Sequence, residues 1–269
     1  MAEYNFKTGV SAGEYRAFLN SSPAYCFTQL PEWSEVKDNW AHDICMLYKD
    51  GVPAVGALLL IRHLPLGKKL IYSPRGPVGD FGDREAMREF AAELKKYAKK
   101  IGAIAVKIDP FVIRENYENQ KAADFGNSFD ETVSVMQECG FIHRGFSLDI
   151  NAYFQPRFNM AVPLFNENGP IDSAGFLKAV PKKTRYYMGS FVRLLGQTEK
   201  RQGISLRNEE YFKKIRHAFG DRAVIYYARM HLDRYVEYLE GLIAKKQNIP
   251  ENTRKLDEAR ALIEEKGNT

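Results

Sequence analysis

Cysteine is scarce in this sequence, and its pattern argues against the small, cross-linked classes of protein. The 269 residues include three cysteines, Cys26, Cys45 and Cys139, an odd number with no C-x-x-C pair. This spacing argues against a disulfide framework and against a zinc site. Such usage fits a reducing compartment, so we expect a cytoplasmic protein.

Long apolar runs and nucleotide-binding loops are also missing. The longest apolar run, residues 52–61, is too short to cross a bilayer, and the N-terminus has no apolar signal region. We therefore expect a globular protein whose only membrane contact is peripheral, at the inner face of the cell membrane. Neither G-x-x-x-x-G-K-[ST] nor G-x-G-x-x-G occurs, and the five histidines form no H-x-x-x-H pair. The sequence therefore disfavours enzymes that bind a nucleotide in a glycine-rich loop, and it predicts no metal site.

Positive charge is concentrated in one segment. The net charge is +5, but residues 176–222 hold 12 Lys/Arg against 4 Asp/Glu, a local balance of +8. Residues 1–175 carry −3, and residues 223–269 carry no net charge. Such a patch attracts RNA, a diphosphate or anionic lipid headgroups. A solvated helix face remains the alternative interpretation.

The first half of the chain has the pattern of an α/β (α+β) domain. Residues 43–62 are two β-rich runs around an Asp50-Gly51 turn, and residues 68–78 add a third, which predicts an antiparallel meander. Asp83 is the expected N-cap of a helix that runs to about Lys100. A buried strand in residues 103–113 follows. A looser helix should end near Gly140, before strands in residues 141–150 and 158–164.

The second half is mainly helical. Apolar spacing and a stop at Gly220 predict helices over 191–201 and 211–220, and AVIYYARM (223–230) predicts a strand. Heptad-like spacing then predicts two helices that flank a turn near Pro250. The residues with this spacing are Leu232, Tyr235, Leu239, Leu242, Leu256, Ala259 and Ile263.

Two short N-terminal motifs have a local explanation. GVSAG fits the G-x-S-x-G pattern of a hydrolase nucleophile, but a poor hydrophobic strand precedes it, so we interpret Ser11 as a helix N-cap. PEWSEVKDNW (31–40) predicts a short helix whose apolar face holds Trp33, Val36 and Trp40, with Lys37 beside that face.

Two polar candidates follow predicted strands. SPRGPV (73–78) places Arg75 and a glycine where the backbone could approach a ligand closely, and a plain turn is the alternative. Asp109 lies at the end of the next strand, where α/β sheets usually carry site residues. Its carboxylate could orient an amine, or it could serve as an ordinary cap or turn residue.

The basic segment supplies the other candidates. TEKRQGISLRNEEYF (198–212) gathers Lys200, Arg201 and Arg207 around a glycine, and arginine binds phosphate oxygens bidentately. PKKTRYY (181–187) interleaves Lys183 and Arg185 with aromatic residues, a composition that suits RNA but is also common on amphipathic helices.

Taken in order, these stretches resemble the FemABX family, the peptidyltransferases that build peptidoglycan interpeptide bridges. The matching stretches are FTQLPEWSEVK, SPRGPV, VKIDPFV, GFIHRGF with QPRFNMAVPL, PKKTRYY and the TEKRQGI to FGDRAVIYYARM run. The resemblance implies tandem lobes with the fold of GNAT acyltransferases and an inserted antiparallel helical hairpin. It places the first lobe in residues 1–165, the second in 166–230 and the hairpin arm in 231–269.

The resemblance also implies a reaction. An amino acid would pass from aminoacyl-tRNA to the stem peptide of lipid II or of UDP-MurNAc-pentapeptide, without a cofactor. By motif position, Lys37 and Arg201 resemble the lysine and arginine that bind the precursor's diphosphate, and Asp109 is the candidate for holding the acceptor. Further substrate-binding candidates are Arg75, Arg207, Lys183 and Arg185.

Two departures from the family pattern affect the second lobe. Members of the family have additional residues between KKTRYYM and GSFVRLL, and they return from the arm to complete the lobe, so the second lobe is incomplete in this sequence. The member is either truncated or defective, or the sequence leaves out segments of a longer chain. We expect the second, because half a lobe would expose a large apolar sheet face. Two alternative functions stay open. RQGIS departs at its last position from the pyrophosphate loop of a CoA-dependent GNAT acetyltransferase. The basic segment and arm would also suit a non-catalytic protein that binds tRNA or a membrane surface.

Overall fold

The structure is a computed structural model that divides the chain into two compact units, residues 1–159 and 160–269. It describes residues 2–23, 25–113, 116–118, 121–123, 128–145, 165–166, 169–170, 177–182 and 184–266. The domain boundaries expected from the resemblance stay a prediction.

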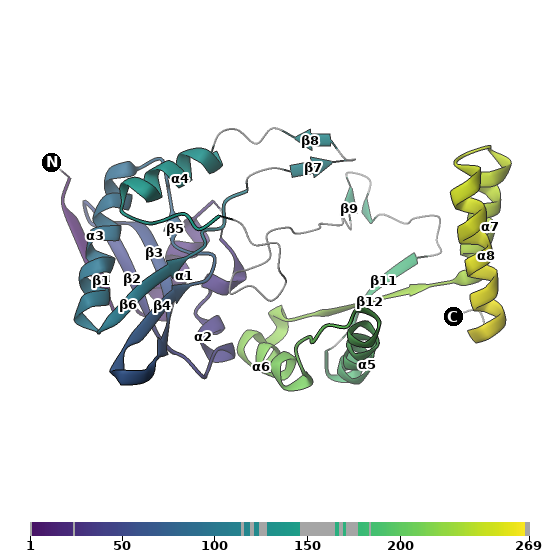
Figure 1. Ribbon diagram of the computed structural model, residues 1–269, viewed down its shortest axis with the longest axis horizontal. Helices are drawn as coiled ribbons and strands as arrows, with labels where there is room; N and C mark the ends of the chain where they lie inside the picture. The colour runs from purple at the N-terminus through teal and green to yellow at the C-terminus, as the bar shows by residue number, and fades with distance from the viewer. Residues whose placement is uncertain are drawn as a thin grey trace. The chain divides into compact units, whose positions relative to one another are not determined.

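A mixed sheet forms the centre of the first unit (Figure 1). Its strands follow the order β1-β2-β3-β4-β6, with β5 paired to β3, and every pairing is antiparallel except that of β4 with β6. The strands are β1 (Tyr4–Thr8), β2 (Ala41–Lys49), β3 (Val52–His63), β4 (Lys69–Ser73), β5 (Val78–Gly79) and β6 (Ala103–Ile108). The predicted meander is therefore confirmed. Asp50 and Gly51 both have positive φ, as a two-residue hairpin turn requires.

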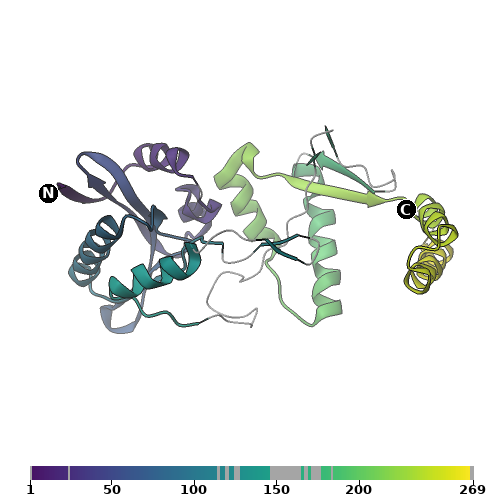
Figure 2. The same ribbon diagram turned by 90° about the horizontal axis from the view of Figure 1, so that it is seen from above.

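Helices cover both faces of this sheet. Figure 2 shows α1 (Ala12–Ser21) and α2 (Glu32–Val36) on one side, and α3 (Arg84–Lys100) and α4 (Ser128–Glu138) on the other. Ser11 and Asp83 are confirmed as N-caps, because their side chains accept hydrogen bonds from the backbone N–H groups of Glu14 and Ala86.

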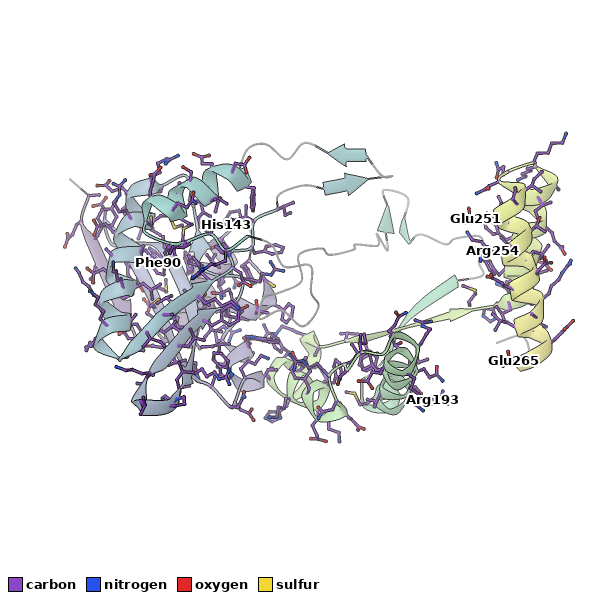
Figure 3. All side chains as sticks on the ribbon, in the orientation of Figure 1. Phe90, His143, Arg193, Glu251, Arg254 and Glu265 are labelled. Atoms are coloured by element: carbon purple, nitrogen blue, oxygen red, sulfur yellow. The ribbon has the colours of Figure 1, made fainter. Side chains whose placement is uncertain are left out.

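Helix α3 seals one face because its apolar residues recur at helical spacing. Met87, Phe90, Leu94 and Ala98 are buried against strand residues such as Leu59, in one hydrophobic cluster. Phe90, labelled in Figure 3, lies between α3 and the sheet and meets Phe6 edge to face.

Two strand predictions need correction. The strand predicted within residues 103–113 is present as Ala103–Ile108, before Pro110, but it is not buried: Ile104 is 65% exposed and Ala105 is also exposed. The reason is that β6 lies at the end of the strand order among the residues that the structure describes. Residues 141–145 are not in a strand, while the rest of the two strands expected at 141–150 and 158–164 falls outside the described residues.

Three short pieces complete the first unit. The 3-10 turns η1 (Phe27–Gln29) and η2 (Pro65–Gly67) lie in loops, and β7 (Asn116–Glu118) pairs with β8 (Lys121–Ala123) in an antiparallel ribbon. Of these, η1 matters for the site described below.

The second unit contains two short sheets and four helices within its described part. The strands β11 (Leu177–Lys182) and β12 (Ile225–Met230) pair antiparallel, as do β9 (Phe165–Asn166) and β10 (Gly169–Pro170). Helix α5 (Thr184–Gln202) begins seven residues before its predicted start, α6 (Glu209–Phe219) ends at Gly220 as predicted, and η3 (Gly220–Arg222) follows.

The predicted helical hairpin is present. Helices α7 (Leu232–Ala244) and α8 (Ile249–Lys266) pack against each other (Figure 1), and Leu239, Leu256 and Ala259 are buried. The heptad-like spacing predicted this hairpin because it places the apolar side chains of each helix on one stripe. The α/β class with an antiparallel helical hairpin is thereby confirmed.

Candidate active site

A buried glutamine fixes the turn that follows β4. The Gln29 side chain has no exposed surface. Its Oε1 accepts hydrogen bonds from Tyr15 Oη (2.8 Å) and from the backbone N–H of Leu58 (3.0 Å). Its Nε2 donates to the carbonyl of Pro74 (2.7 Å) and to Ser73 Oγ (3.2 Å). One amide group therefore ties η1, α1, β3 and the 73–76 turn together.

The turn itself has no room for a side chain at Gly76. A Cβ there would lie 2.3 Å from Ser73 Oγ and 2.7 Å from the amide of Gln29. Thr28 adds a second bond from η1, from its Oγ1 to the carbonyl of Pro74 (3.0 Å). Arg75 adopts a left-handed conformation with φ of 58°. The turn is therefore set by buried polar contacts.

The turn presents a backbone donor to Asp109. Because β4 and β6 run parallel, with Ser73 opposite Ile108, the segments that follow these strands emerge at the same edge of the sheet. The Arg75 N–H donates to Asp109 Oδ1 (2.6 Å), and Tyr72 Oη donates to Asp109 Oδ2 (2.9 Å). The half-buried carboxylate is therefore held in one orientation by two donors.

A lysine that the sequence analysis did not single out completes this cluster. Lys107 lies directly opposite Tyr72 in the β4–β6 ladder, and its Nζ is 4.5 Å from the centroid of the Tyr72 ring. Burial lowers the pKa of Lys107, and the negative charge of Asp109 opposes that effect. The alternation of a strand, which puts residues two apart on one face, could have linked Lys107 to Asp109.

Lys37 lies at the C-terminal end of α2. Its half-buried side chain places Nζ 5.2 Å from the Trp33 ring centroid, and its backbone N–H donates to the Trp33 carbonyl (3.1 Å). Trp33 is 4% exposed and meets the exposed Phe27 ring edge to face at 5.2 Å. The aromatic residues therefore fix the short helix and support the lysine stem beside them.

Lys37 and the residues around Asp109 lie on the same side of the sheet. Tyr72 pairs with Leu60, which shares a strand face with Gly56 and Arg62. A Cβ at Gly56 would lie 2.9 Å from Tyr15, so this face of the sheet is the one that the aromatic rings of α1 cover. On the same face, the Arg62 guanidinium lies 5.8 Å from the centroid of the Trp40 ring. Helix α2, which ends at Lys37, lies on the same side of the sheet as α1 (Figure 2). The strand pairing places Tyr72 and Lys107 on that face.

Arg75 contributes mainly through its backbone. Besides the N–H bond to Asp109, its guanidinium lies 6.0 Å from the Phe111 ring centroid. A substrate-binding role for this side chain stays a prediction.

The other predicted cations lie in the second unit. Arg201 is exposed in the last turn of α5, and exposed Arg207 lies 5.2 Å from the Tyr211 ring, just before α6. Lys183 falls outside the described residues; Arg185 lies in α5, and nothing is described of its side chain. Whether Arg201 opposes Lys37 therefore stays a prediction.

The RQGIS segment is the end of a helix. Gly203 has φ of 64°, and its N–H donates to the Glu199 carbonyl (2.8 Å), as a helix C-terminus requires. Pyrophosphate loops use the opposite end, where free N–H groups and the positive dipole meet the anion. This geometry disfavours the CoA-dependent alternative at RQGIS, while Lys200 and Arg201 complement the helix dipole there.

Two features are absent from the part of the chain that the structure describes. Among those residues, no cluster of three or more His, Cys, Asp or Glu could hold a metal ion. No described helix is both long enough and apolar enough to span a membrane.

Fold and site together define an α/β protein whose polar cluster lies at the carboxyl ends of two parallel strands in an otherwise antiparallel sheet. The model of the FemAB family matches residues 10–189 and 179–268. The chain belongs to the FemAB family.

Similar proteins agree with this assignment. The chain is 28% identical over 226 residues to the "Lipid II:glycine glycyltransferase" of Staphylococcus haemolyticus (strain JCSC1435), covering 78% of this chain and 51% of that one. It is 28% identical over 274 residues to the protein of that name from Staphylococcus aureus (strain MRSA252), covering 96% and 60%. The chain thus spans between half and three fifths of these relatives.

A solved structure shares the fold. The crystal structure of FemX matches with a TM-score of 0.66 at 22% identity, over 99% of this chain and 74% of that one. The match covers residues of both units and shows that the fold is shared.

Proposed function

We propose that this protein is an aminoacyltransferase that extends the stem peptide of a lipid-linked peptidoglycan precursor. Its relatives are named for the transfer of glycine to lipid II. We further propose that the donor is an aminoacyl-tRNA and that the acceptor is an amine of the stem peptide. The main support for this proposal is the Asp109 carboxylate, which two hydrogen bonds orient at the carboxyl ends of β4 and β6.

The chemistry needs positioning more than activation. The ester of an aminoacyl-tRNA is already reactive, so holding an amine at its carbonyl can supply much of the rate enhancement. Both oxygens of Asp109 already accept one hydrogen bond, and a carboxylate oxygen has lone pairs for another. In our proposal the oriented Asp109 carboxylate also accepts a hydrogen bond from the attacking nitrogen.

Binding of the precursor would depend on cations from both units. Lys37 lies beside Trp33 of α2 in the first unit, and Arg201 is exposed on α5 in the second. We propose that both contact the diphosphate of the precursor, because charge-assisted hydrogen bonds to phosphate are strong. The basic segment 176–222 would attract the tRNA.

Transfer of labelled glycine, alanine or serine from charged tRNA to lipid II tests the proposal. UDP-MurNAc-pentapeptide as a second acceptor shows whether the lipid is required. We expect Asp109→Asn to slow transfer roughly 100-fold, and Lys37→Met to raise the KM for the precursor about tenfold. Asp257→Asn and Lys95→Met, at exposed positions, serve as matched controls. No transfer by the unaltered protein, or equal rates for Asp109→Asn and Asp257→Asn, would contradict the proposal.

A further inference from the structure

An inference about Lys107 rests on the proposed function, in which Asp109 holds the acceptor amine. It concerns the protonation state of that amine. A carboxylate such as Asp109 stabilises a neighbouring ammonium and so raises its pKa. The acceptor would then be held in the protonated form, which has no lone pair and cannot attack an ester. A site that uses a carboxylate to hold its nucleophile needs a compensating charge.

Lys107 supplies that charge. It shares a sheet face with Tyr72, its Nζ lies 4.5 Å from the Tyr72 ring centroid, and Tyr72 Oη donates to Asp109 at 2.9 Å. The interaction between Lys107 and Asp109 is electrostatically favourable. We propose that Lys107, acting through Tyr72 and Asp109, favours binding of the acceptor amine in its neutral, nucleophilic form.

The proton balance of the step is simple. The acceptor ammonium releases one proton to solvent, and the neutral nitrogen bonds to the carbonyl carbon of the ester. The bond between that carbon and the ribose oxygen breaks, and the second proton lost by the nitrogen goes to that oxygen. Lys107 acts as a positioning residue: it stays a cation and neither forms nor breaks a covalent bond.

Other charged groups on this face have contacts of their own. Arg16 of α1 pairs with Glu32 of α2 at 2.6 Å, Arg62 of β3 lies over Trp40, and Lys37 lies over Trp33. The guanidinium of Arg75, after β4, lies beside Phe111. Lys107 interacts electrostatically with Asp109.

The test compares how kcat/KM for the acceptor depends on pH in the unaltered protein, Lys107→Met and Lys107→Arg. We expect Lys107→Met to move the rising limb to higher pH by roughly one unit, which lowers kcat/KM about tenfold near neutral pH. Lys107→Arg keeps the charge and should restore the limb. Lys99→Met, exposed on α3 at the opposite face, is the control. A uniform loss of rate with an unmoved limb would show a merely structural role and overturn the inference.

A binding measurement separates this inference from the proposed function. An acceptor peptide labelled with 13C beside its amine can be titrated by NMR in complex with the protein, without a donor. We expect the bound amine to titrate at lower pH on the unaltered protein than on Lys107→Met. Equal titration on both proteins overturns the inference even if transfer is observed. If the bound amine has a lower pKa on the unaltered protein than on Lys107→Met but no transfer occurs, the inference is supported and the proposed function fails.

Discussion

At the scale of single residues, the site depends on one buried amide. Gln29→Leu would remove the Gln29 partner of the Leu58 N–H and of the Tyr15 hydroxyl, and one of the two donors to the Pro74 carbonyl. Buried groups that lose their hydrogen bonds are costly, so we expect a loss of about 3 kcal/mol in the free energy of unfolding. Urea denaturation measures this loss.

The exposed Gln137 of α4 offers a matched control. We expect Gln137→Leu to change the free energy of unfolding by less than about 0.5 kcal/mol. If Gln29→Leu were as stable as Gln137→Leu, the hydrogen bonds of Gln29 would not hold the 73–76 turn.

At the scale of elements, α3 is the helix whose packing secures the sheet that carries the site. Phe90 is 2% exposed within the cluster shared by α3 and the strands. Truncating a buried phenylalanine removes its contacts and leaves a cavity, so Phe90→Ala should cost about 3 to 5 kcal/mol. Thermal denaturation checks it.

The control lies on the solvent side of the same helix. Lys95 is exposed, and alanine is a slightly better helix former than lysine. Lys95→Ala should therefore leave the melting temperature nearly unchanged. Equal melting temperatures for the two variants would mean that α3 does not anchor the sheet.

At the scale of the whole molecule, the uneven charge distribution predicts how the proposed binding of tRNA responds to salt. If basic side chains of residues 176–222 neutralise three phosphates, affinity should fall roughly forty-fold between about 50 and 200 mM salt. Arg193, labelled in Figure 3, and Lys200 are exposed on α5. Replacing both with glutamine should reduce the slope of log K against log salt by about 2.

The hairpin provides the comparison for this charge effect. On α8, Arg254 pairs with Glu258 and Lys255 with Glu251, in a segment of the chain without net charge. We expect glutamine at positions 254 and 255 to leave the salt slope unchanged. An equal slope for the α5 and α8 variants would contradict a role for the basic segment in binding tRNA.

The elements that local physics specifies were predictable from the sequence. The caps at Ser11 and Asp83, the Asp50-Gly51 turn and the α7–α8 hairpin each follow from residues a few positions apart. The exposed strand β6 was not foreseen, because its apolar composition matches a buried strand while its exposure depends on where it joins the sheet.

The sequence by itself determined the helices, the meander and the charged segment. It also identified Lys37 and Asp109 as candidate site residues. Only the tertiary structure decided that β4 and β6 pair in parallel, which brings Tyr72, Lys107 and the Arg75 N–H to the Asp109 carboxylate. It also decided the four hydrogen bonds of Gln29. Periodicity reports which face a residue occupies along its own element, whereas these contacts join residues far apart in the chain.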